Sequence, residues 1–427
     1  MSIDDYTDDE WPTMPNGSDF DGKHLLQLVR SGKSPFAGAW DVDLLIRGVE
    51  QRLNASVIDI PDVTCGRNNY GIHFKMRCHP DVVVRLARGD INMPRFGGRR
   101  LQIQVNEVKF EAAVYALLRQ EPSILASRLL YHHVPVEKSI RTSPPPDISG
   151  RRLFVFERAD VKDNIWRDIS PHGKITLLAQ AARIRASLFN FTLPQDFATT
   201  WLPKRLFEQR PERIQAPVAP TRDFCVALIT SKIEATVGDI GDSIGQDHGM
   251  AGPIAAAAKA AKESLMRFVP HMLPTDVNQS SLYRLVLEHG DFGIHNMTVT
   301  IAENSNQPLV TSLYDWERGC IVPAILSDPM MAMPVNSVID EDSFEPYMTQ
   351  ALPNTTPSDP QEFSTLTKEY FRVLFDEAPD YERAIQAGKD ARHLWFALRG
   401  WQNEEPEQFF SSLRIWAEQR MDALDIS

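Results

Sequence analysis

Three oxygen-bearing side chains in the last third of the chain are spaced in a way that could place them around one substrate. Asp291 and Asn296 are five residues apart in a segment that also contains two glycines. Because glycine is conformationally free, both side chains can point into one small space. Two β-favouring runs follow, 297–301 and 309–314, with a turn-prone stretch between them. A hairpin there returns the chain, so we expect Asp315 to lie beside Asn296.

This set of side chains suits phosphoryl transfer. An amide and a carboxylate together supply the hard oxygen ligands that Mg²⁺ prefers. A separate carboxylate can orient and deprotonate an attacking hydroxyl group, so that most of the catalysis consists of positioning and charge neutralisation. We interpret His289 as a buried support of the loop. A transition-metal site of His289, Asp291 and His295 is an alternative, but it leaves the Asp-Trp-Glu sequence at 315–317 unexplained.

Short β-favouring runs come first among the elements that must position these residues. Three runs are separated by turn-prone residues, which is typical of an antiparallel meander. A helix with apolar residues in helical spacing and two further strands follow. In order, these elements are 57–60, 72–76, 82–86, the helix within 105–118, 129–131 and 153–156. The first compact unit is therefore predicted to be β-β-β-α-β-β, ending near Arg158.

The rest of the chain changes character and is mainly helical. Amphipathic patterns predict helices over 177–191, 255–268, 363–375, 391–401 and 409–421. We therefore predict an α+β fold, in which a small antiparallel β-rich lobe with one helix precedes a larger helical lobe. The predicted segments are a disordered acidic tail over 1–36, the β-rich lobe over 37–157 and the helical lobe over 158–427, with the loop 287–297 and the segment 313–317 inside it.

The composition argues against several classes of protein. The 427 residues carry a net charge of −12, which disfavours nucleic-acid binding through a general cationic surface. No stretch approaches the roughly 20 apolar residues of a membrane span, and the acidic N-terminus lacks the pattern of a signal or transit peptide. The four cysteines form no close pair and no metal-type spacing, which indicates a reduced, cytoplasmic protein. We expect neither nucleic acid nor membrane as a partner.

Together these motifs resemble a known family. His289-Gly-Asp291 with Asn296 is similar to the His-Gly-Asp motif, followed after four residues by Asn, of the aminoglycoside phosphotransferase family, relatives of choline and protein kinases. The Asp-Trp-Glu sequence at 315–317 resembles the metal-binding segment of that family. The resemblance covers about 59–329 and is closest to uncharacterised fungal members. It implies a protein-kinase-like fold of two lobes.

The resemblance also implies a role for each matching residue. Asp291 would be the catalytic base, and Asn296 and Asp315 would bind Mg²⁺. The loop between the first two strands would cover the phosphates of ATP, and the hinge after the fifth strand would contact adenine through its backbone. The residues implied for the nucleotide are Gly66, Asn69 and Gly71 in the loop and Glu157 and Ala159 at the hinge.

Arg85 departs from the pattern of the family, which usually has a lysine on the third strand paired with a helix glutamate. Arginine keeps the positive charge and can grip phosphate oxygens with its fork, so ATP binding is retained in this interpretation. We expect Glu111 to be the helix partner, with Glu107, one turn earlier, as the alternative. The loop that contains Gly66 also lacks a full Gly-x-Gly-x-x-Gly pattern.

The sequence thus predicts an ATP- and Mg²⁺-dependent phosphotransferase with a small-molecule hydroxyl substrate of open identity. A pseudokinase, which would bind nucleotide or act as a scaffold without turnover, is the alternative that Arg85 favours. A protein kinase is a third reading. It is disfavoured because Pro329 follows Asp315 after only 14 residues, which leaves little room for a long activation loop. The oligomeric state stays open.

Overall fold

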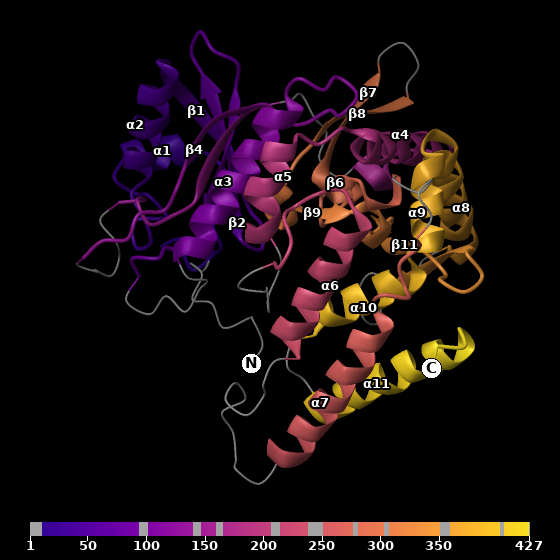
Figure 1. The fold of residues 1–427 in the computed structure, drawn as a ribbon. Coiled ribbons are helices and arrows are strands. Elements are labelled where there is room, and N and C mark those ends of the chain that lie inside the picture. Colours follow the sequence, from indigo (N-terminus) through magenta and orange to yellow (C-terminus); the bar gives the residue numbers. More distant parts are fainter. Residues whose placement is uncertain are drawn as a thin grey trace. The chain divides into compact units, whose positions relative to one another are not determined.

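The computed structural model describes most of the chain, and these residues pack as two compact units. The described residues are 11–93, 101–139, 147–158, 165–205, 214–237, 251–275, 281–302, 307–350, 359–401 and 405–426. The first unit takes in the residues up to 163 and two later segments, 297–300 and 310–317. The second unit contains 164–296, 301–309 and 318 onwards. Figure 1 shows the elements of both units.

The first unit is built on an antiparallel sheet of five strands in the order β1-β2-β3-β5-β4. The strands are β1 (Val57–Cys65), β2 (Asn69–Met76), β3 (Val82–Ala87), β4 (Leu129–His133) and β5 (Leu153–Glu157), and helix α3 (Leu101–Leu118) lies between β3 and β4 in the chain. This is the predicted β-β-β-α-β-β order. The α+β fold class is confirmed.

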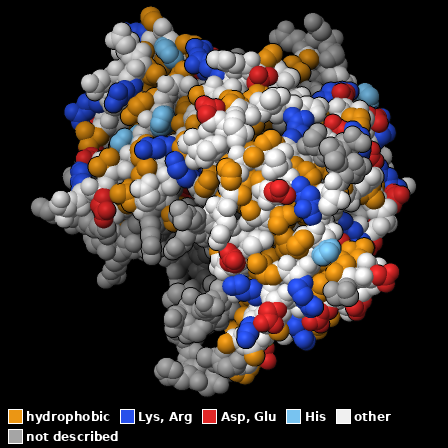
Figure 2. Space-filling view, in the orientation of Figure 1, with side chains coloured by type: hydrophobic (Ala, Val, Ile, Leu, Met, Phe, Trp, Pro, Cys, Tyr) orange, Lys and Arg blue, Asp and Glu red, His pale blue; other side chains and the backbone are white. Residues whose placement is uncertain are grey.

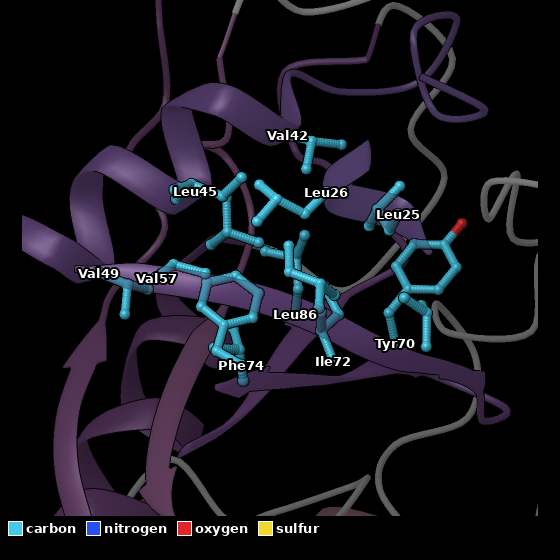
Figure 3. Packing of buried hydrophobic residues seen from close by; sticks show 14 of the residues in the cluster. Leu25, Leu26, Val42, Leu45, Val49, Val57, Tyr70, Ile72, Phe74 and Leu86 are labelled. Carbon is cyan, nitrogen blue, oxygen red and sulfur yellow. The ribbon is translucent and has the colours of Figure 1, made fainter. Parts of the chain in front are cut away.

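The Arg85 side chain of β3 points away from the core cluster of the first unit, the group of buried apolar side chains on one face of the sheet. Val84 and Leu86 are fully buried in that cluster, and side chains alternate between the two faces of a strand. Arg85 therefore points to the opposite face, where Phe154 of β5 is its register partner. Figure 3 shows the cluster itself, where side chains from the sheet meet side chains from two helices that precede it.

Those preceding residues correct one expectation. Helices α1 (Leu25–Arg30) and α2 (Val42–Leu53) precede the sheet, and Phe20, Leu25 and Phe36 are only 3%, 0% and 1% exposed in its core cluster. The prediction of a disordered tail is therefore wrong for 11–36, whereas residues 1–10 lie outside the described residues. Although this segment is acidic, it contains a few apolar side chains that are buried in the core cluster of the sheet.

The second unit is mainly helical. Its helices are α4 (Pro171–Asn190), α5 (Gln195–Trp201), α6 (Arg222–Thr236), α7 (Ala251–Phe268), α8 (Pro360–Glu377), α9 (Pro379–Ala387), α10 (Lys389–Gly400) and α11 (Pro406–Ala423). Five of these match the predicted helices, whereas α5, α6 and α9 were not predicted. Helix α4 packs against α8, and α7 packs along α11 (Figure 1). Among the described residues, no helix combines the length and apolarity that a membrane span requires.

Short strands frame the loop that carries Asp291. Strand β6 (Leu285–Glu288) pairs with β9 (Cys320–Pro323), so that Glu288 lies opposite Cys320. A further antiparallel sheet consists of β10 (Met331–Ala332), β11 (Val335–Ile339) and β12 (Pro346–Gln350). The predicted strand pair after Asn296 is observed as β7 (Met297–Ala302) and β8 (Gln307–Leu313). Its turn, 303–306, lies outside the described residues.

Candidate active site

Arg85 joins two carboxylates of the first unit. Its Nη1 donates to Oδ1 of Asp315 at 3.0 Å, and its Nη2 donates to Oε1 of Glu111. The guanidinium also lies over the ring of Phe154, with 4.8 Å from Cζ to the ring centroid, a favourable cation–π position. The structure therefore places Arg85 against Glu111, the expected helix partner. Glu107 accepts instead from Arg152.

The charges around Arg85 shift two pKa values. Burial alone would lower the pKa of Arg85, but Glu111 and Asp315 outweigh it and raise that pKa above its ordinary value. The pKa of Glu111 is raised to about 7, mainly by burial and also by the negative charge of Asp315, against the opposing effect of Arg85. Arg85 therefore stays charged. Its one positive charge faces two carboxyl groups, Glu111 and Asp315, and an additional cation nearby would offset their excess of negative charge.

Asp315 adopts a backbone conformation that its surroundings must support. Its φ of +66° lies in the left-handed region, which Asp tolerates better than most residues. Its backbone N–H donates to the hydroxyl oxygen of Tyr115 at 3.0 Å, and that hydroxyl donates to Glu111 at 3.4 Å. The next residue, Trp316, is fully buried. The direction of the Asp315 carboxylate is therefore set by helix α3 as well as by Arg85.

In the second unit, the chain turns sharply at Gly290 immediately after β6. Gly290 has φ +77°, and a Cβ added there would lie 2.0 Å from the backbone oxygen of Arg318. Both facts require glycine, because a side chain would be strained and would collide with backbone that cannot move aside. The glycine of His-Gly-Asp thus allows the loop to run directly against the chain at Arg318.

Asn296 fastens the other end of this loop. Its Nδ2 donates to the backbone oxygen of Asp291 at 2.8 Å, and its own N–H donates to the Gly293 oxygen at 3.0 Å. The Asn296 side chain is buried. Nδ2 is a hydrogen-bond donor only, so the oxygen Oδ1 is the atom through which Asn296 can bind a cation.

The Asp291 side chain is 38% exposed and faces His295, with 3.3 Å between Oδ2 and Nε2. The hydrogen bond from His295 is the main reason that the pKa of Asp291 lies below its ordinary value, and it outweighs partial burial, which acts in the opposite direction. Asp291 is therefore ionised at neutral pH. His289 is fully buried and packs edge-to-face on Phe292, with 6.2 Å between ring centroids, as expected for a support of the loop.

A buried polar network, which the sequence reasoning missed, lies beneath the same loop. Nη2 of Arg185 on α4 donates to Glu288 at 2.6 Å and to the Tyr381 hydroxyl at 2.9 Å, and it also donates to the backbone oxygen of Asp328. Ser327 donates to the other oxygen of Glu288. Arg185 therefore connects the strand before Asp291 with the segment after β9 and with helix α9. An arginine on the apolar face of a predicted amphipathic helix was the available signal.

No protein-family model and no curated protein matches the chain. Spectinomycin phosphotransferase in complex with ADP and spectinomycin is a similar solved structure, with 11% identity, a TM-score of 0.33, and coverage of 88% of this chain and 98% of that one. The microcompartment-associated aminopropanol kinase has 13% identity, a TM-score of 0.34, and coverage of 89% and 98%.

A third similar structure is the macrolide 2′-phosphotransferase of Brachybacterium faecium, with 11% identity, a TM-score of 0.36, and coverage of 87% of this chain and 98% of that one. At TM-scores below 0.5 these similarities carry no functional argument.

Besides Arg85 and Glu111, four of the residues expected to bind the nucleotide lie in or next to strands of the first unit: Gly66, Asn69, Gly71 and Glu157. Gly66 donates its N–H to the Asn69 oxygen at 2.9 Å in the turn between β1 and β2, and Gly71 pairs with Arg85 in the sheet. Glu157, the last residue of β5, donates its N–H to the Arg128 oxygen at 3.0 Å. Ala159 lies outside the described residues. The phosphate and adenine contacts of these residues stay predictions.

The metal ligands are likewise a prediction, because Asn296 belongs to the second unit and Asp315 to the first. Among the described residues, no group of three or more His, Cys, Asp or Glu side chains forms a ready-made metal site. Mg²⁺ takes few protein ligands and completes its shell with water and substrate phosphates. One amide oxygen and one carboxylate therefore fit the donor set that Mg²⁺ uses with a nucleotide.

On the face drawn in Figure 2, Lys and Arg side chains lie among Asp and Glu.

Proposed function

We propose that this protein transfers the γ-phosphate of ATP to a hydroxyl group of a small molecule. The observation that carries the proposal is the double contact of Arg85. One guanidinium binds Glu111, 26 residues away, and Asp315, 230 residues away. A strand cation, a helix carboxylate and the aspartate of Asp-Trp-Glu are the groups that a phosphotransferase needs to hold phosphate and metal. The protein-kinase-like fold and a cytoplasmic location belong to the same proposal.

Asp291 would act as the base in this reaction. Its low pKa keeps it ionised, so it accepts a hydrogen bond from the substrate hydroxyl and orients the oxygen toward the γ-phosphorus. As the new O–P bond forms, the hydroxyl proton passes to Asp291. The bond to the β,γ-bridging oxygen breaks, and that oxygen leaves with the electron pair as part of ADP. A weak base suffices, because the hydroxyl becomes acidic only as its oxygen bonds to phosphorus.

Asn296 and Asp315 would hold Mg²⁺, which neutralises the negative charge of the ATP phosphates when it is bound. Asn296 would use Oδ1, while its Nδ2 donates a hydrogen bond to the backbone oxygen of Asp291 and fixes the orientation of the amide. Arg85 would contact the phosphates of the nucleotide, and Glu111 keeps its guanidinium in place. The turn that contains Gly66, Asn69 and Gly71 and the hinge from Glu157 to Ala159 would cover the phosphates and bind adenine.

A second candidate is a pseudokinase that binds nucleotide without turnover. Arg85 favours it, because its guanidinium already contacts Asp315, the carboxylate proposed for the metal. The presence of Asp291, Asn296 and Asp315 disfavours it, because a chain that needed no turnover would not need these three together.

The decisive experiment is incubation of the purified protein with Mg·ATP and a metabolite extract, followed by a mass-spectrometric search for products that have gained a phosphate. We expect at least one product with the wild type and none with Asp291→Asn. Asp315→Ala should weaken the binding of Mg·ATP measured by calorimetry, since it removes the anionic ligand. Thermal stabilisation by ATP with no ADP formed would identify the pseudokinase. Unchanged Mg·ATP affinity in Asp315→Ala would place the metal elsewhere.

A further inference from the structure

The Asp-Trp-Glu segment has a second arginine that the proposed function does not use. Nη1 of Arg152, the residue before β5, donates to Oε1 of Glu317 at 2.8 Å and to Oε2 of Glu107 at 3.4 Å. Arg85 makes the same kind of double contact with helix α3 and with the Asp-Trp-Glu segment. Each arginine binds one glutamate of α3 and one carboxylate of the segment. Glu107 and Glu111 are four residues apart, so they lie on one face of α3.

This second group of charges is buried. The side chains of Arg152, Glu107 and Glu317 are only 14%, 3% and 17% exposed. Removing charges from water is costly, and good hydrogen-bond geometry is needed to offset that cost. Trp316, between the two carboxylates of the segment, is fully buried. The segment is therefore held at three successive residues, of which Asp315 alone is proposed to bind metal.

The two arginines have different tasks. In the proposed function Arg85 contacts phosphate as well as Asp315, so its hold on Asp315 changes when the nucleotide binds. Arg152 is not proposed to contact phosphate, so its contact with Glu317 need not change when the nucleotide binds. A support through Glu317 would keep Asp315 in its left-handed conformation while Arg85 turns to the phosphates. With such a support, the Asp315 carboxylate would keep the same direction with and without bound nucleotide.

We propose that Arg152, through Glu317, is the positioning residue that keeps the Asp315 carboxylate aimed at the metal. The inference rests on the proposed function for the identity of that metal site. The alternative is an ion pair that only stabilises the first unit. Four variants separate the two: Arg152→Met, Arg152→Lys, Glu317→Gln and the double variant Arg152→Met/Glu317→Gln. Lys138→Met is the matched control, because Lys138 also pairs with a carboxylate of the first unit, Asp147 at 2.5 Å, but is about one-third exposed.

The first measurement does not depend on catalysis. Hydrogen exchange of the peptide over 313–318 is compared with that of the peptides of β2 and β3. We expect Arg152→Met to accelerate exchange over 313–318 by about tenfold or more, with little change in β2 and β3. Lys138→Met should change neither. Unchanged exchange over 313–318, or equal acceleration throughout the first unit, would overturn the proposal.

The second measurement is ADP affinity by calorimetry, with Mg²⁺ and with a chelator. We expect Arg152→Met and Glu317→Gln each to weaken Mg·ADP about tenfold, without changing the affinity for metal-free ADP. The double variant should be no worse than either single variant, because the two groups act as one unit. Arg152→Lys, which keeps the charge but loses the fork, should recover part of the affinity. An equal loss with and without Mg²⁺ would overturn the metal-directed role.

The failure of the proposed function has its own signature. If wild-type protein binds no ADP under either condition, the nucleotide assignment fails, and the exchange over 313–318 still decides whether Arg152 positions Asp315. If wild-type protein binds Mg·ADP and Arg152→Met does so equally well, the proposed function stands and the role of Arg152 is refuted. Should Arg152→Met fail to fold, Arg152→Lys and Glu317→Gln give the same comparison with smaller changes.

Discussion

The loop of the second unit that carries Asp291 and the segment of the first unit that carries Asp315 are held in place by different means. In the loop, Asn296 bonds to the Asp291 backbone five residues away, and His295 faces the Asp291 carboxylate four residues away. In the segment, Asp315 contacts Arg85 at a separation of 230 residues and Tyr115 at 200. The side-chain contacts of Asp291 and Asn296 are thus local, whereas Asp315 takes its geometry from distant side chains. Substitutions in the loop should alter its backbone conformation, whereas substitutions around the segment should alter the balance of charge between Arg85, Glu111 and Asp315.

The largest effect is expected from the loop. Asp291→Asn keeps the size of the side chain but cannot accept the hydroxyl proton, so kcat should fall by about 10² to 10⁴, the usual range for a general base. The affinity for Mg·ATP should change little, because Asp291 is not proposed to bind metal. Steady-state kinetics and calorimetry together test this. Wild-type turnover in Asp291→Asn would remove the base from the proposed reaction.

The buried network beneath the loop gives the next largest effect. Arg185→Met leaves Glu288 buried without its cation, and the free energy of unfolding should fall by about 3–5 kcal/mol. Arg183 on the same helix is the matched control, since Arg183 and its partner Glu377 are 57% and 49% exposed. Arg183→Ala should cost no more than about 1 kcal/mol. Denaturant titrations of the two variants provide the comparison, and equal losses would mean that burial does not distinguish these ion pairs.

Gly290→Ala tests a non-local feature of the loop, its close approach to Arg318. The methyl group would lie 2.0 Å from the Arg318 oxygen at a φ of +77°. The strained backbone alone should cost about 1–3 kcal/mol, and the collision should displace the loop, so that activity and stability fall together. Thermal unfolding and kinetics of the one variant test this. Gly17→Ala is the control, because it has a similar φ of +83° but no atom within 4 Å of the added Cβ.

Around the segment, the effects should be smaller and coupled. Arg85→Ala should raise the KM for ATP and lower kcat, each by about tenfold, because a phosphate-positioning charge is lost. Arg85→Lys should be partly active, since the shorter ammonium cannot reach both Glu111 and Asp315 as a fork does. Glu111→Gln combined with Arg85→Ala should be less than additive, because the two groups act as a pair. Additive losses would show that the observed contact has no kinetic role.

The same contrast explains what the sequence could predict. The order of the elements along the chain and the hairpin after Asn296 could be predicted because alternation, turns and short motifs are local features. Arg152, Tyr115 and Arg185 were missed because their partners are brought to them only by the fold. Arg151 and Arg152 illustrate this: adjacent in the chain, they point to different partners, Asp90 and Glu317. The alternation before β5 predicts opposite directions for the two arginines, but it does not identify the carboxylate that each one meets.

The smallest effect concerns the proton of Asp291. Because the pKa of Asp291 in the folded protein lies below its ordinary value of 3.8, its charge contributes stability that is fully present above that pH and is lost as the pH falls through the folded value. His295→Ala removes the main cause of the lowering, while Arg318 and His289 continue to favour the charged form. The acid limb of the pH–kcat profile should therefore move upward, by less than about one unit because the half-exposed carboxylate is screened by water. His172→Ala, a change at an exposed histidine of α4, should leave the profile unchanged. An acid limb that stays in place or moves downward in His295→Ala would mean that the hydrogen bond from His295 does not lower the pKa of Asp291.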